Sequence, residues 1–203
     1  MVAWWNSSLG ADQIAATEIR TGLWTLRFLA ITLAVTPARQ LLGLSALAKY
    51  RRMLGLFAFF YAMIHVFTWS WADMDFDLGF MGREIAKHKY ILIGMLTFVI
   101  LIPLALTSTK GWIKRMGGRR WNRLHQLVYV AAVTGTIHYL WAVKKDTFFP
   151  LVYLVVFIAL LGYRLVRSVQ SRSARLATRE AADRKSTRLN SSHNRESRMP
   201  SSA

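Results

Sequence analysis

Three histidines, His65, His125 and His138, lie within long apolar stretches of this 203-residue chain. Ionisable side chains are rare in membrane-crossing segments, and those that occur there usually serve a function. Imidazole is the commonest metal ligand in proteins and a usual axial ligand of haem iron. These residues therefore favour a metal or haem centre inside an apolar helix bundle. For each of them, a hydrogen bond between helices is the alternative role.

The elements that would carry these histidines are long apolar runs, at residues 53–72, 90–109, 124–143 and 147–163. A hydrocarbon core about 30 Å thick needs roughly 20 apolar residues in a helix. The first three runs fit, and the fourth fits if Arg164 extends to the surface. A weaker span precedes them at residues 21–38, interrupted by Arg27. The predicted fold class is an all-α, polytopic transmembrane bundle with five spans.

Charge predicts how these spans are oriented. The loops at residues 39–52 and 110–123 hold lysine and arginine without any acid, and arginines follow residue 163. The loops on the opposite side hold the acids Asp73, Asp75, Asp77, Glu84 and Asp146 beside a few lysines. Because basic loops stay in the cytoplasm, the pattern predicts a multi-pass membrane protein with an outer N-terminus and a cytoplasmic C-terminus.

Residue counting places two of the histidines at one depth. His65 lies 12 residues after Met53, about 18 Å along its span. His138 lies 14 residues after Leu124, about 21 Å along a span that runs in the same direction. Two facing helices could therefore present one imidazole to each face of a single haem.

His125 is 13 residues before His138, about 20 Å closer to the cytoplasmic side. That depth suits a second haem, but Arg51 and Arg52 stand at the matching height of the other span. On a straight helix, the two imidazoles would point roughly 140° apart. Either Gly135 allows a bend or the two histidines face different helices.

Three other features have competing interpretations. Arg27 could pair with a haem propionate or extend to the membrane surface. The basic segment at residues 110–123 could hold a flavin phosphate or a quinone head group, although such loops usually determine topology. His88 lies between Lys87 and Lys89, which favours a solvated side chain.

Composition excludes several classes of protein. The chain has no cysteine, so disulfides, iron–sulfur clusters, thiolate zinc sites and cysteine nucleophiles are excluded. Of the net charge of +17, +5 belongs to residues 171–203 and most of the remainder lies in loops beside apolar spans, which indicates a lipid environment and not nucleic acid. We find no phosphate-binding glycine loop and no paired catalytic carboxylates.

The chain divides into three predicted parts. Residues 1–20 form an N-terminal stretch on the outer side, and residues 21–169 form the transmembrane domain. Residues 170–203 are polar and rich in serine and arginine, which predicts a disordered tail. The last part of this tail resembles adapter-derived read-through, so His193 is left out of the functional interpretation.

Three segments carry a family resemblance. They read TLAVTPARQLLG at residues 32–43, RRMLGLFAFFYAMIHVFTW at 51–69, and LTSTKGWIKRMGGRRWNRLHQLVYVAAVTGTIHYLW at 106–141. Over residues 18–167 the chain resembles the MsrQ (YedZ) family of haem-binding membrane subunits, which belongs to the ferric reductase-like transmembrane group. The motifs LTS, RW-x-x-LH-x-x-VY and IHYLW give the resemblance its specificity.

The resemblance implies a b-type haem protein of the bacterial inner membrane, with one or two haems and FMN. The family's haem ligands match His65, His125 and His138. Its members take electrons from the quinone pool, with a cytoplasmic flavin reductase as a further donor. They pass the electrons to MsrP, a periplasmic molybdenum-cofactor enzyme that reduces methionine sulfoxide in oxidised proteins.

The chain departs from the family at its start, where relatives usually have one more span, which favours a truncated opening. It also carries His88-Lys89-Tyr90 where many relatives read R-P-Y. Two other functions stay open at this stage. One is a different ferric reductase-like cytochrome b with another acceptor, and the other is a haem-free membrane scaffold.

Overall fold

Helices account for all regular secondary structure in residues 13–143 and 147–196, which the computed structural model describes. The order is α2 (Gln13–Leu42), the 3₁₀ helix η1 (Ser45–Lys49), α3 (Arg51–Thr68), the π-helix η2 (Trp69–Asp73), α4 (Leu78–Lys87), α5 (Lys89–Leu106), α6 (Lys110–Met116), α7 (Gly118–His125), α8 (Leu127–Ala142) and α9 (Phe148–Glu196). Residues 1–12 and Asp146, which entered the predicted topology, lie outside the described residues.

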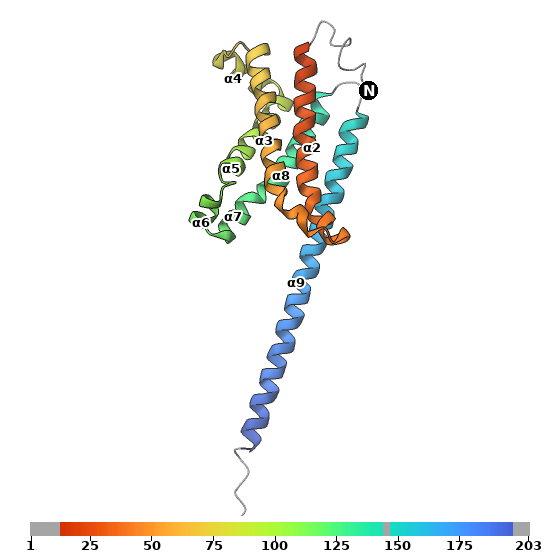
Figure 1. The fold of residues 1–203 in the computed structure, drawn as a ribbon, viewed down its shortest axis with the longest axis vertical. Helices are drawn as coiled ribbons and strands as arrows, with labels where there is room; N and C mark the ends of the chain where they lie inside the picture. Colours follow the sequence, from red (N-terminus) through yellow and green to blue (C-terminus); the bar gives the residue numbers. More distant parts are fainter. Residues whose placement is uncertain (1–12, 144–146, 197–203) are drawn as a thin grey trace, which may run out of the picture. The chain divides into compact units, whose positions relative to one another are not determined.

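Two antiparallel helix pairs form the centre of the fold (Figure 1): α2 packs mainly against α3, and α5 mainly against α8. Small buried residues line the contacts, including Ala58 and Ala62 on α3 and Ala131 and Ala132 on α8. Small side chains allow helix backbones to approach closely in a membrane. The larger core side chains, Leu26, Leu29, Leu33, Leu101 and Phe157, fill the space between the helices.

Large apolar side chains also cover the outside of the bundle. Phe60, Val99 and Val155 are 48%, 57% and 65% exposed. In the part of the chain that the structure describes, four helical segments are long and apolar enough to cross a membrane: Gln13–Leu42, Arg51–Asp73, Lys89–Leu106 and Phe148–Ala182. The predicted all-α transmembrane fold is therefore confirmed.

The span predicted at residues 124–143 needs a correction. The apolar helix α8 has 16 residues and begins at Leu127, whereas His125 is the last residue of the short polar helix α7. The two helices are separated at Gln126, whose N–H bonds the carbonyls of both Asn122 and Arg123. The Tyr129 N–H then bonds the Gln126 carbonyl three residues back. This tighter turn interrupts the α-helical ladder, so His125 and His138 do not share one helix.

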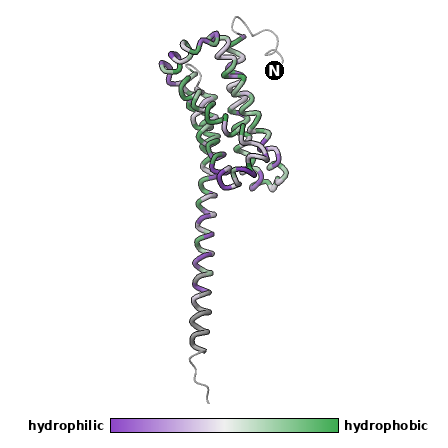
Figure 2. The backbone as a smooth tube through the Cα atoms, turned by 90° about the vertical axis from the view of Figure 1, so that its left-hand side faces the viewer, coloured by the Kyte–Doolittle hydropathy of each residue, from purple (hydrophilic) through white to green (hydrophobic). Residues whose placement is uncertain are grey.

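The two ends of the bundle differ in charge. Figures 1 and 2 show α4 at one end, with η1, α6 and α7 at the other, and polar residues concentrated at both. The end with η1, α6 and α7 carries Arg39, Lys49, Arg51, Arg52, Lys110, Lys114, Arg115, Arg119, Arg120 and Arg123. The end with α4 carries Asp73, Asp75, Asp77 and Glu84 beside Arg83, Lys87 and Lys89. Basic residues without acids therefore gather at one end of the bundle, as the sequence pattern predicts.

Helix α9 is divided between two compact units, which meet in sequence at Leu161 and Gly162. Within the second unit the helix continues to Glu196, and the disordered tail from residue 170 stays a prediction. Residues 165–182 are exposed, as expected for a polar segment without a core. Alanine, arginine, leucine and glutamate in this stretch have high helix propensity, which accounts for the helix.

Candidate functional site

A cavity of about 480 Å³ opens among α2, α3, α5 and α8. Its walls are mainly apolar and include Leu26, Leu29, Met95, Phe98 and Leu101. This size is within the range of small-molecule and cofactor pockets, about 300–1,000 Å³. Apolar walls exclude water and keep the local dielectric low, so polar groups in the cavity interact strongly with a bound ligand.

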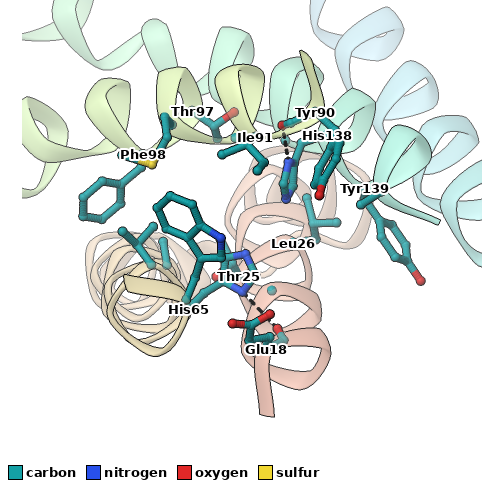
Figure 3. A pocket seen from close by; sticks show the side chains of 18 of the residues that line it. Glu18, Thr25, Leu26, His65, Tyr90, Ile91, Thr97, Phe98, His138 and Tyr139 are labelled. Atoms are coloured by element: carbon teal, nitrogen blue, oxygen red, sulfur yellow. Dashed lines mark hydrogen bonds between the residues drawn. The ribbon is translucent and has the colours of Figure 1, made fainter. Parts of the chain in front are cut away.

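His65 of α3 and His138 of α8 face each other in this cavity (Figure 3). The centroids of their imidazole rings are 6.1 Å apart, and the ring planes meet at 75°. His65 is residue 15 of the 18 in α3, and His138 is residue 12 of the 16 in α8. The two histidines therefore lie at similar depths, as residue counting predicted, and their side chains are close together.

A backbone carbonyl fixes the orientation of each ring (Figure 3). The His65 Nδ1 lies 2.9 Å from the Glu18 carbonyl oxygen, and the His138 Nδ1 lies 2.7 Å from the Tyr90 carbonyl oxygen. Because a carbonyl only accepts, each Nδ1 must carry the hydrogen and donate it. In the neutral imidazole, Nε2 then keeps its lone pair. Histidines that bind metals have this arrangement, in which an outer partner fixes the tautomer.

Two imidazoles are too few ligands for a closed zinc site, which needs four. Within residues 13–143 and 147–196, no group of three or more His, Asp or Glu side chains could hold a metal ion. A haem supplies four equatorial nitrogens of its own and needs only axial ligands from the protein. Because the ring centroids are 6.1 Å apart, both imidazoles could reach one haem iron through bonds of about 2 Å, so the histidine pair fits a haem.

His125 lies apart from this pair, near the basic end of the bundle. Its ring stacks on Trp121 with centroids 3.8 Å apart, and its Nε2 lies 3.1 Å from the Thr107 hydroxyl oxygen. That hydroxyl donates its hydrogen to the Pro103 carbonyl at 2.6 Å. Nε2 of His125 must therefore be the donor to Thr107, and His125 is not among the residues that line the cavity.

The remaining predicted residues have local contacts. The Arg27 Nε donates to the Tyr153 hydroxyl at 3.3 Å, and its guanidinium lies 4.8 Å from the Trp24 ring centroid. Arg27 is not among the described residues that line the cavity, so its pairing with a haem propionate stays a prediction. His88 lies 3.2 Å from Glu84, one helical turn earlier, in a partly exposed pair.

Sequence reasoning missed the residues that hold the histidines. Two glycines, Gly22 on α2 and Gly94 on α5, lie against the rings of His65 and His138. A glycine in an apolar span indicates a close helix contact, but not which side chain it meets. The carbonyls of Glu18 and Tyr90 could not be predicted from residue types, because every residue has one.

Comparison with known proteins gives the family. Residues 21–136 match the family described as "Ferric reductase like transmembrane component". The protein-methionine-sulfoxide reductase heme-binding subunit MsrQ of Xanthomonas campestris pv. campestris (strain 8004) is 44% identical over 167 residues, 82% of this chain and 76% of the relative. The corresponding MsrQ of Polaromonas naphthalenivorans (strain CJ2) is 47% identical over 163 residues, 79% of this chain and 74% of the relative. The chain belongs to the MsrQ family.

MsrQ membership confirms the resemblance seen in the sequence motifs and the ferric reductase-like transmembrane fold. It makes the chain a multi-pass membrane protein. No solved structure matches the chain significantly. The relatives' names mention haem but no flavin, so FMN stays a prediction for this MsrQ chain.

Proposed function

We propose that the chain is a haem b membrane subunit that relays electrons from the quinone pool to a periplasmic reductase of the MsrP type. That partner would use the electrons to repair methionine sulfoxide in oxidised proteins. The observation that carries the proposal is the pair of facing imidazoles, each with Nδ1 bonded to a carbonyl, in an apolar cavity. The relatives are named as heme-binding subunits of a methionine-sulfoxide reductase, which supports the same function.

In this proposal, His65 and His138 would hold a haem iron through their Nε2 atoms. A bound haem b supplies one-electron oxidation and reduction. The protein holds both imidazoles in one tautomer through Glu18 and Tyr90, and its apolar walls exclude water. Axial ligands, their hydrogen bonds and burial are the means by which a protein sets a haem potential.

The charge distribution supports an orientation for the relay. We place the basic end, with η1, α6 and α7, in the cytoplasm according to the positive-inside rule. His65 and His138 then lie toward the periplasmic end of their helices, on the side of the partner. The inner-membrane location, the quinone donor and a cytoplasmic flavin reductase belong to the same proposal.

A second haem at His125 is a further part of the proposal. His125 lies near the basic end, where electrons would enter, and Trp121 supports its ring. Ligation through Nε2 would require the bond to Thr107 to break. An FMN on the basic segment at residues 110–123 rests on the family resemblance alone.

A pyridine haemochrome assay on the purified chain tests the central claim. We expect haem b, with a low-spin spectrum that is lost in His65→Ala. A haem-free protein, or a full low-spin spectrum in His65→Ala, would contradict the proposal. Mixing the reduced protein with an MsrP-type reductase or with ferric chelates then separates the proposed acceptor from an alternative one.

A further inference from the structure

The two imidazoles of the cavity are held in the same way by two different helices. His65 meets α2 at Glu18 and at Gly22, four residues later. His138 meets α5 at Tyr90 and at Gly94, again four residues later. In each case the first residue supplies the carbonyl that accepts the Nδ1 hydrogen, and the second is a glycine whose missing side chain leaves room for the ring.

Helix geometry explains the spacing of four. In a regular α-helix, a carbonyl accepts the N–H of the residue four positions later. The side chain of that later residue lies on the same face, one turn along. A glycine there uncovers the carbonyl, so that a side chain from a neighbouring helix can share it. The helix keeps its own bond, and the imidazole gains an acceptor inside an apolar bundle.

The space for a side chain differs between the two glycines. A Cβ added to Gly94 would lie 2.6 Å from Nδ1 and 2.8 Å from Cε1 of His138. Contacts that short are overlaps, so the His138 ring would have to move. A Cβ added to Gly22 would lie 3.4 Å from Nδ1 and Cε1 of His65, which is a close but ordinary contact.

We propose that Gly22 and Gly94 are positioning residues, which set the tautomer and direction of His65 and His138 by exposing the carbonyls of Glu18 and Tyr90. Both glycines line the cavity, and an added Cβ at Gly22 would also lie 3.9 Å from Nε2 of His65. The idea deepens the proposed function, on which it rests, by naming what holds the axial ligands in place.

The test compares Gly94→Ala, Gly22→Ala and a control, Gly55→Ala, in the purified full chain. Gly55 lies on α3, and an added Cβ there would meet only the Thr32 methyl carbon at 3.9 Å. Alanine favours helix more than glycine at all three positions, so a loss confined to Gly94 would be due to displacement of the ring.

Two measurements distinguish positioning from simple structural damage. The first is the low-spin haem spectrum with its reduction potential. We expect Gly94→Ala to weaken haem retention by about 10–100-fold, as is typical when an outer partner of a metal ligand is lost. We expect Gly22→Ala to keep the haem with a shifted potential, and Gly55→Ala to match the unaltered chain.

The second measurement uses ¹⁵N-histidine NMR on haem-free protein, so it does not depend on the proposed function. We expect Nδ1–H tautomers for His65 and His138, and loss of the His138 tautomer signal in Gly94→Ala. An unchanged tautomer and spectrum in Gly94→Ala would overturn the role of Gly94. If Gly94→Ala does not fold, Gly22→Ala decides, because an unchanged His65 tautomer and potential would overturn the proposal.

A haem-free unaltered chain would contradict the proposed function, while the tautomer measurement would still test the positioning role.

Discussion

The two ends of the bundle use histidine in opposite ways. Toward the end with α4, His65 and His138 bond backbone carbonyls through Nδ1, which leaves Nε2 without the hydrogen. At the basic end, His125 donates from Nε2 to the Thr107 hydroxyl and stacks on Trp121. The same residue type is thus prepared for ligation in one place and held by a hydrogen bond and a ring contact in the other.

The difference comes from the acceptor that each ring meets. A carbonyl on a neighbouring helix fixes the Nδ1–H tautomer and leaves the opposite nitrogen available for a ligand. The Thr107 hydroxyl donates its hydrogen to the Pro103 carbonyl, so its oxygen accepts the hydrogen from Nε2 of His125. Apolar surroundings and sequence depth alone do not distinguish these arrangements.

Replacing one member of the facing pair should have the largest effect. His138→Ala removes a proposed haem ligand. Loss of an outer partner of a metal ligand typically weakens binding by about 10–100-fold, so we expect a larger fall in haem binding for this variant. Low-spin absorbance per mole of purified protein measures the loss. Circular dichroism should stay helical, and retention of the full low-spin signal would remove His138 from the ligand set.

His125→Ala should leave the signal of the His65–His138 haem in place. The variant would lose only the haem proposed at His125. It would also lose the ring contact with Trp121, and such contacts contribute about 0.5–1.5 kcal/mol to stability. Measuring the ratio of haem to protein in both His125→Ala and His138→Ala tests this expectation. Equal and complete haem loss in both variants would show that the two ends do not behave separately.

A smaller effect is expected for Thr107→Val, which removes the acceptor of the His125 Nε2 hydrogen. The competing hydrogen bond is worth about 1 kcal/mol, roughly fivefold in affinity. We therefore expect haem binding at His125 to strengthen by that factor, with no change in the His65–His138 spectrum. Haem titration of the purified variant measures it, and weaker binding would mean that Thr107 supports the ligand.

His88→Ala should change least. His88 lies between the end of α4 and the start of α5 and forms a partly exposed pair with Glu84 on α4. Such surface pairs contribute about 0–1 kcal/mol to stability. We expect an unchanged haem spectrum and a melting temperature within a few degrees. The His88 ring also lies 5.6 Å from the Tyr90 ring, between centroids, so loss of haem in this variant would assign that contact a part in the site.

The sequence by itself determined the membrane class, the helical fold and the two ligand candidates. Long uncharged runs leave few alternatives to transmembrane helices, because unpaired backbone groups are too costly in lipid. The depth of His65 and His138 follows from the constant rise of a helix. The loops that hold basic residues without acids predicted that these residues would gather at one end of the bundle.

Only the tertiary structure decided how each histidine is used. The break at Gln126 separates His125 from the helix of His138, although both belong to one apolar run. The acceptors of all three rings come from residues 18 or more positions away along the chain: Glu18, Tyr90 and Thr107. Residue types encode neither helix rotation nor close approach. The packing of α2 on α3 and of α5 on α8 therefore selects the nitrogen that faces the cavity.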